Sequence, residues 1–222
     1  MTLAEALSPT AKPTQPMSDT WLPVAWDEYQ ALVTDPANDK TKCYYYRGHM
    51  RLEMPPVSHD HAESDGTITL AVNLFGIAQG IRFKVLGNCS YRKSGVAECQ
   101  PDVSFYLGDK TQAVPFGTGV IDLETYPAPD LVIEVAKSSL FDDLSVKRFL
   151  YESLGVKEYW VVDVEKIEIT AYVMTDGGSN RIQGSQVLPG LAFTVLEEAL
   201  RRSRETDQSQ VGAWLLSQFQ SG

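Results

Sequence analysis

The sequence predicts an α/β domain with a mixed β-sheet, and three observations support this fold class. Residues 63–78 carry apolar side chains at helical spacing, which indicates a helix with one buried face. Residues 131–136 (LVIEVA) are apolar on both faces, which is typical of a central strand buried between two layers. The predicted elements follow one another as helix, strands, helix and strand, an order that favours helices flanking a sheet.

The length and composition indicate one domain with tails. The chain has 222 residues, of which 43% are hydrophobic and 22% charged, as in ordinary globular proteins. Residues 1–19 contain three prolines and few large apolar residues, so we expect a flexible N-terminal arm. Residues 20–222 are expected to form a single domain that ends in an amphipathic helix at 207–220.

Cysteine usage and hydropathy bear on the cellular compartment. Cys43, Cys89 and Cys99 form no CxxC pair, and their odd number argues against a disulfide framework. No stretch approaches the roughly 18 apolar residues of a membrane span, and the N-terminus lacks the pattern of a signal peptide. We therefore expect a cytoplasmic protein that does not contact a membrane.

The remaining elements follow from local patterns. We expect a helix at 26–33, a hairpin around Gly48 at 44–54, β-rich segments at 83–94 and 97–107, a long loop at 108–129, a helix at 142–155, and two paired strands at 158–164 and 167–174. Asp142 or Asp143 is expected to cap the helix at 142–155, and Gly155 to end it. Gly177-Gly178 is interpreted as a hairpin turn.

Glu134 is the first candidate for a functional residue. It lies in the middle of the apolar strand 131–136, where an ionised carboxylate loses its hydration when the chain folds. Such a group needs a cation, a network of donors or a metal. A plain ion pair with an Arg or Lys at the strand end is the alternative interpretation.

A partner acid for Glu134 is expected on the neighbouring strand. Asp130 lies four residues along the same strand, roughly 13 Å away, which is too far for one ion. An acid on the adjacent strand lies only about 4.8 Å away, and Asp102 is the candidate. Asp130 is then a residue of the strand entry, and the same structural role is the alternative for Asp102.

Lys147 is the third member of the predicted site. On an ideal helix it lies in the middle of an apolar stripe formed by Leu144, Leu150, Tyr151 and Leu154. A lysine in this position either extends its stem towards solvent or pairs with a buried carboxylate. A structural ion pair with Glu134 is the alternative to a catalytic role.

These residues stand in a block that resembles the signature of the Uma2 family. The block at 129–164 reads PDLVIEVAKSSLFDDLSVKRFLYESLGVKEYWVVDV, and the similarity extends over about residues 26–200, with QPDVSFYL at 100–107 and VLPGLAFTV at 187–195. The resemblance implies a PD-(D/E)XK restriction-endonuclease-like core and a metal-dependent endonuclease activity on DNA. It also implies that Asp102 and Glu134 bind Mg²⁺ or Mn²⁺ and that Lys147 provides the site lysine.

The sequence departs from the (D/E)XK pattern at one position. The pattern places lysine at 136, where this chain has Ala136. Lys137 is adjacent, but strand alternation turns it to the opposite face, so it is an auxiliary candidate only. His61 matches the single histidine that the family has before its long helix and is the second auxiliary candidate. His59 and His61 lack the further ligands that a zinc site would need.

The net charge of −10 weighs against DNA as the substrate, because phosphate contacts normally require Lys and Arg. Two alternatives therefore remain. One is a catalytically inactive nuclease fold that acts as a binding or dimerisation module, and the other is a nuclease for a target smaller or more exposed than duplex DNA. A homodimer is expected by analogy with endonucleases that cut two strands.

Overall fold

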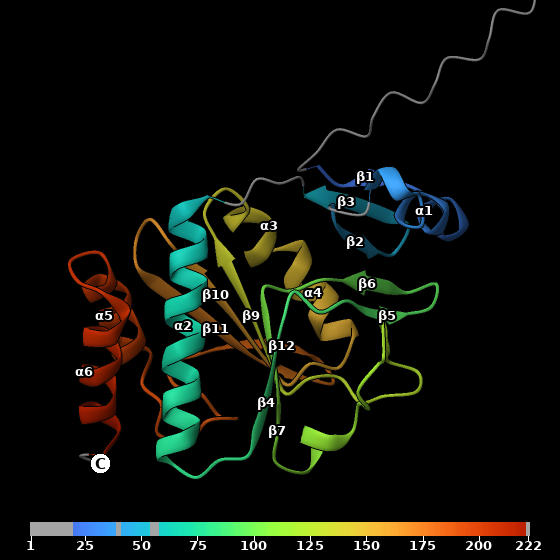
Figure 1. Cartoon of the computed structure of the whole chain (residues 1–222). Coiled ribbons are helices and arrows are strands. Elements are labelled where there is room, and N and C mark those ends of the chain that lie inside the picture. The colour runs from blue at the N-terminus through green and yellow to red at the C-terminus, as the bar shows by residue number, and fades with distance from the viewer. Residues whose placement is uncertain (1–19, 39–40, 54–57, 221–222) are drawn as a thin grey trace, which may run out of the picture.

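Figure 1 shows the chain as a computed structural model, which describes residues 20–38, 41–53 and 58–220. The described residues form two six-stranded sheets and six α-helices, which confirms the expected α/β class with a mixed sheet. The arm expected at residues 1–19 lies outside the described residues. In the described ranges, no helix combines the length and apolar character that crossing a membrane requires.

The main sheet is mixed and contains the expected central strand. Its strands are, in spatial order, β12 (Gly178–Ile182), β11 (Glu168–Thr175), β10 (Glu158–Asp163), β9 (Leu131–Ala136), β7 (Val103–Leu107) and β4 (Phe83–Gly87). β9 and β10 run parallel, and the other neighbours are antiparallel. All six residues of β9 are buried, as its sequence predicts. The pairing of β10 with β11 confirms the two strands expected there.

A second sheet was not anticipated from the sequence. Its strands are, in spatial order, β1 (Leu22–Pro23), β3 (His49–Glu53), β2 (Lys42–Tyr46), β6 (Ala97–Cys99), β5 (Tyr91–Lys93) and β8 (Ile121–Asp122). β2 and β3 form the expected hairpin. Its two turn residues, Arg47 and Gly48, have φ angles of 46° and 82°, as a two-residue hairpin turn of the primed type requires.

The two sheets share the β-rich segments expected at 83–94 and 97–107, because each segment divides between them. The first divides near Asn88, whose φ of 50° turns the chain out of the main sheet. The second divides at Pro101, which has no N–H to continue a ladder. This division brings Asp102 to the start of β7, beside the second sheet.

Helices cover the main sheet on both faces. The helices are α1 (Trp26–Val33), α2 (His59–Ala78), α3 (Leu140–Leu144), α4 (Val146–Ser153), α5 (Phe193–Ser203) and α6 (Gln208–Gln220), with 3-10 turns η1 (Pro36–Asn38) and η2 (Gly108–Gln112). α5 and α6 stand beside α2 (Figure 1) and share one core with it, whereas α4 belongs to the core on the opposite face. Ile133 of β9 faces the α2 side, and Val132 faces the α4 side.

The helix expected at 142–155 is instead two short helices, α3 and α4. Ser145 separates them with φ −117° and ψ −94°, which lie outside the helical region. Asp142 and Asp143 are not N-caps, because both lie in the first turn of α3, which begins after Ser139. Gly155 follows the end of α4 with φ 77°, as expected of a terminating glycine.

Four further features differ from the expectation. α2 begins at His59, because the Ser58 hydroxyl caps it by accepting the His61 N–H at 3.3 Å. The long loop at 108–129 contains η2 and the short strand β8. α5 was not anticipated, and the turn expected at Gly177-Gly178 lies one residue earlier.

Candidate active site

Asp102 and Glu134 lie side by side on neighbouring antiparallel strands. β7 pairs with β9 so that Val103 faces Ile133, which places Asp102 next to Glu134. The Val135 N–H donates to Asp102 Oδ2 at 2.8 Å, and the Asp102 N–H donates to Glu134 Oε2 at 3.4 Å. The backbone of the two strands therefore orients both carboxylates, and the strand spacing produces the proximity that the sequence predicts.

Glu134 lies on the face of β9 that α4 and the second sheet cover, and it is only 2% exposed. Its Oε1 accepts hydrogen bonds from Tyr151 Oη at 2.6 Å and Tyr44 Oη at 3.1 Å. Burial raises the pKa of Glu134 to about 8, against the opposing effect of two nearby lysines. Ionised Glu134 is therefore costly and calls for cations.

Lys42 of β2 provides one of these cations and was not recognised from the sequence. Its Nζ lies 2.6 Å from Asp102 Oδ1 and 3.8 Å from Glu134 Oε2, so one ammonium bridges the two acids. Burial alone would lower the pKa of Lys42, but Glu134 and Asp102 raise it above its ordinary value. Burial would raise the pKa of Asp102, but Lys42 and His61 hold it well below its usual range.

Lys147 provides the second cation and lies on the buried face of α4, as the sequence predicts. Its Nζ is 3.8 Å from Glu134 Oε1, but its shorter contacts are to Glu53 Oε1 and Asp143 Oδ1, both at 2.8 Å. The ammonium also lies 4.2 Å from the ring centroid of Tyr44. The Lys147 side chain is only 1% exposed. The contact with substrate that the sequence predicts for it would therefore have to form at an ammonium group that solvent hardly reaches.

The two auxiliary candidates lie in different places. His61 of α2 joins the acid pair, with its Nε2 3.3 Å from Asp102 Oδ2, and this contact raises the pKa of His61 although burial opposes it. Lys137 instead pairs with Asp60 Oδ2 at 2.6 Å on the more exposed side of α2. His59 is solvent-exposed and faces Asp60, so it does not share a site with His61.

No group of three or more His, Cys, Asp and Glu side chains in the described residues is arranged to hold a metal ion. The site is instead a network of acids and bases. Its members are Lys42, Arg51, Glu53, Asp102, Glu134, Asp142, Asp143 and Lys147. The network contains five carboxylates and three cations, and the His61 ring adds a further contact to Asp102.

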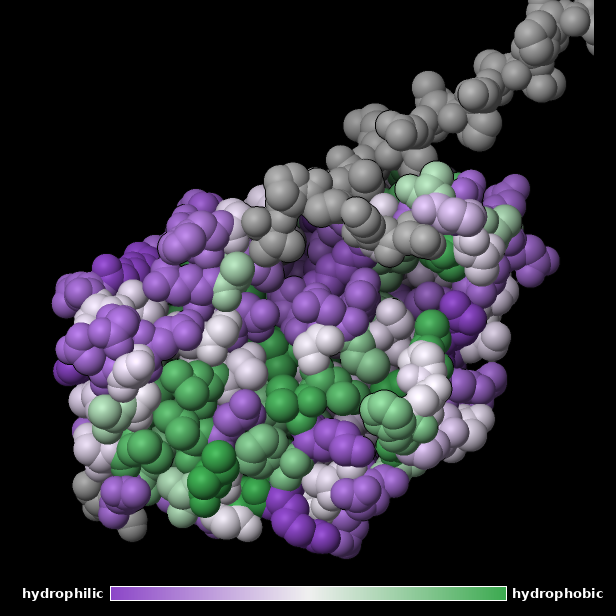
Figure 2. Space-filling model, in the orientation of Figure 1, coloured by the Kyte–Doolittle hydropathy of each residue, from purple (hydrophilic) through white to green (hydrophobic). Residues whose placement is uncertain are grey.

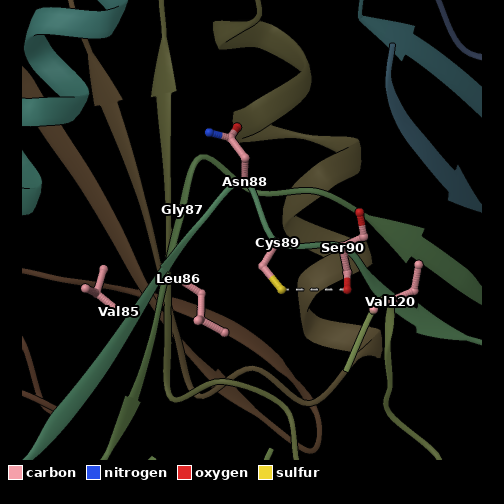
Figure 3. A pocket seen from close by; sticks show the side chains of 8 residues that line it. Val85, Leu86, Gly87, Asn88, Cys89, Ser90 and Val120 are labelled. Carbon is pink, nitrogen blue, oxygen red and sulfur yellow. Dashed lines mark hydrogen bonds between the residues drawn. The ribbon is translucent and has the colours of Figure 1, made fainter. Parts of the chain in front are cut away.

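The surface near this network is polar. In Figure 2, hydrophilic residues gather between α2 and the β2–β3 hairpin, whereas apolar residues gather over the lower part of α2 and near β4. A hollow of about 520 Å³ lies at the end of β4 (Figure 3). Its lining offers one titratable group, Cys89, whose thiol pKa is raised by burial, so this hollow provides no acid–base chemistry near neutral pH.

Asp130, the strand-entry residue, and two arginines of α5 have structural partners. Asp130, at the opposite end of β9 from Ala136, accepts the Leu107 N–H at 2.9 Å and pairs with Lys110 and Lys157, which supports its interpretation as a strand-entry residue. Arg201 and Arg202 both pair with Glu198 on the surface of α5. These contacts account for the positions of these charged side chains, so no ligand is needed to explain them.

The acid pair, the central strand and the lysine-bearing helix all lie within residues 26–209, the range over which the chain matches the family model of Uma2, described as "Putative restriction endonuclease". The chain belongs to the Uma2 family. Among solved structures it resembles "a putative nuclease belonging to DUF820" from Anabaena variabilis, with a TM-score of 0.57, 16% identity, and coverage of 80% of this chain and 99% of that one. That likeness supports the nuclease-type fold. A comparison with curated proteins gives no match.

Asp65 of α2 is expected to make the stability of the protein depend on pH. Burial, followed by the nearby Asp102 charge, raises the pKa of Asp65 from 3.8 to about 6. The folded chain thus holds this proton more tightly than the unfolded chain, and the associated stability is lost as the pH rises through about 6.

We therefore expect Asp65→Asn to stabilise the protein at pH 7.5 by about 1 kcal/mol, a value reduced for the partial exposure of the group. The gain should be largely lost at pH 3, where Asp65 is mostly protonated in both the folded and the unfolded wild type. Thermal unfolding at the two pH values would test this, with exposed Asp176→Asn as the control. An equal effect of Asp65→Asn at both pH values would show that charge burial is not its cause.

Proposed function

We propose that this Uma2 protein is a metal-dependent endonuclease that hydrolyses phosphodiester bonds of DNA, with Asp102 and Glu134 as the ligands of Mg²⁺ or Mn²⁺. The observation that carries the proposal is the bridging contact of Lys42, at 2.6 Å from Asp102 and 3.8 Å from Glu134. A cation shared by two converging carboxylates marks the space where a divalent ion would be favoured.

The donor set fits magnesium or manganese. Mg²⁺ prefers oxygen ligands and is commonly held by one or two carboxylates, with water and substrate phosphate completing its shell. A site of two acids meets this requirement even though the described residues contain no three-residue cluster.

Some groups of the site would bind the metal, and others orient the two carboxylates. A bound divalent ion would polarise the phosphodiester and lower the pKa of its bound water. The Val135 N–H fixes the direction of Asp102, and the hydroxyls of Tyr44 and Tyr151 fix that of Glu134. His61 holds the second oxygen of Asp102. Such second contacts keep ligands in place and increase metal affinity.

A homodimer is the form that we propose for cleavage of both DNA strands, because each chain offers one acid pair for one strand. The net charge of −10 requires that phosphate binding depend on local cations and the bound metal. We therefore expect binding to DNA to depend strongly on the divalent ion.

Asp102→Asn tests the proposed activity. The amide keeps the shape of the side chain but removes the negative charge, so Mg²⁺- or Mn²⁺-dependent cleavage of plasmid and single-stranded DNA should fall by about a hundredfold or more. Asp109→Asn is the matched control, because Asp109 is fully exposed and its ion pair within the described part of the chain is with Arg82.

Equal cleavage by the wild type and Asp102→Asn would refute the site assignment. If the folded wild type cleaves none of these DNAs with either metal, the nuclease fold serves binding or dimerisation instead.

A further inference from the structure

Two lysines approach different oxygens of the Glu134 carboxylate, and they differ in what else they contact. Lys42 comes from β2 of the second sheet, and the two carboxylates that it pairs with among the described residues are those of the acid pair. Lys147 comes from α4, and its two closest partners, Glu53 and Asp143, lie outside that pair. The Lys42 side chain is 18% exposed and that of Lys147 is 1% exposed.

We infer that Lys42 is the lysine of this site that faces the substrate. Before a metal binds, its ammonium neutralises Asp102 and Glu134. After a metal binds, the ammonium contacts the substrate phosphate or the water that attacks this phosphate. This inference rests on the proposed function and assigns to Lys42 the role that the sequence suggested for Lys147. Lys147 is then a positioning residue that keeps the carboxylates of Glu53 and Asp143 in place beside the acid pair.

The cost of moving each lysine supports this assignment. If Lys147 moved to a phosphate, Glu53 and Asp143 would lose a contact of 2.8 Å each, and Asp143 is buried. Losing a partner inside a protein leaves an uncompensated charge, which is strongly unfavourable. If Lys42 moved, a divalent ion between Asp102 and Glu134 would compensate both acids that it leaves.

Both lysines reach the face of β9 on which the (D/E)XK pattern places its lysine. Glu134 and Ala136 lie on the same face of β9, and a lysine at 136 would point towards this side of the sheet. Lys42 reaches the same face from β2, which places an ammonium beside the acids that the (D/E)XK pattern would supply from the strand itself.

The experiment compares Lys42→Met with the wild type in two measurements on the full chain. In the first, Mn²⁺ alone is titrated without DNA. Loss of the competing ammonium should tighten Mn²⁺ binding by about fivefold or more. In the second, cleavage is measured at saturating Mn²⁺, where the rate should fall by about a hundredfold or more because a group that stabilises the phosphate is gone. Lys166→Met, with a side chain 70% exposed, is the matched control and should leave both values unchanged.

Lys42→Arg provides a second variant that keeps the charge, and therefore the folded state, while changing the shape of the donor. It should fold and still cleave at least about tenfold more slowly than the wild type. Wild-type cleavage by either variant, or weaker Mn²⁺ binding by Lys42→Met, would overturn the inference.

Failure of the proposed function has a different signature. In that case Asp102→Asn would bind Mn²⁺ as the wild type does. That result would refute the proposed metal site and therefore also the role of Lys42. If Asp102→Asn loses Mn²⁺ while Lys42→Met retains unchanged affinity and rate, the metal site stands and only the assignment of Lys42 is wrong.

Discussion

Replacing Lys147 with methionine is expected to lower the free energy of unfolding by about 3–5 kcal/mol. The ammonium contacts Glu53 and Asp143 at 2.8 Å and lies 3.8 Å from Glu134. Methionine fills a similar volume but offers no charge, so these acids would lose a shared cation in a region that water hardly reaches. Part of the cost will be avoided by protonation, because burial already raises the pKa of Glu134 to about 8.

Urea unfolding at pH 7.5 would measure this loss as a lower transition midpoint with an unchanged slope. Lys166→Met is again the control, since it removes an exposed partner 3.7 Å from Asp163 and should change stability by less than about 0.5 kcal/mol. If the free energy of unfolding of Lys147→Met lies within about 1 kcal/mol of the wild-type value, Lys147 does not hold the carboxylates of Glu53 and Asp143 in place.

The sequence predicts the acid pair because local geometry determines it. Residues alternate across a strand and neighbouring strands are about 4.8 Å apart, so a buried Glu134 needs a partner on the next strand. Asp102 is found there, with its N–H donating to Glu134 at 3.4 Å. The same reasoning places Lys147 on the buried stripe of α4, where it lies. Asp143, four residues before Lys147, pairs with it at 2.8 Å instead of capping the helix, as helical i,i+4 spacing allows.

Lys42 could not be found in this way, because its place depends on the second sheet. That sheet forms because β5 and β6 leave the main sheet at Asn88 and Pro101, and β2 then pairs with β6 through Tyr45 and Glu98. Local propensity does not reveal such long-range pairing. From the sequence, alternation shows only that Lys42 and Tyr44 share a strand face. The hydrogen bond from Tyr44 to Glu134, which places that face at the site, is seen only in the structure.

Glu134→Gln is expected to abolish most metal binding while leaving the fold intact. The amide is neutral and is a poor ligand for Mg²⁺, which prefers anionic oxygen. Affinity should therefore fall by more than about a hundredfold, because even groups that only hold a ligand in place contribute ten- to hundredfold. Cleavage should fall by at least the same factor, about 2.7 kcal/mol in the barrier.

The fold should tolerate this change because glutamine resembles the neutral form of Glu134. Burial raises the pKa of Glu134 above its ordinary value, so this position accommodates a neutral side chain more easily than an isolated charge. The amide oxygen can still accept hydrogen bonds from Tyr44 and Tyr151. We expect the thermal midpoint of Glu134→Gln to stay close to that of the wild type, and exposed Glu124→Gln to change neither stability nor metal binding.

Mn²⁺ titration and thermal unfolding of the same Glu134→Gln sample decide between the two interpretations of this residue. A structural ion pair predicts lower stability with no metal effect, since Lys42 and Lys147 would lose a charge that they share. A metal ligand predicts the reverse. Wild-type affinity for Mn²⁺ in this variant would therefore assign Glu134 to the structural network and leave Asp102 without a partner for a metal site.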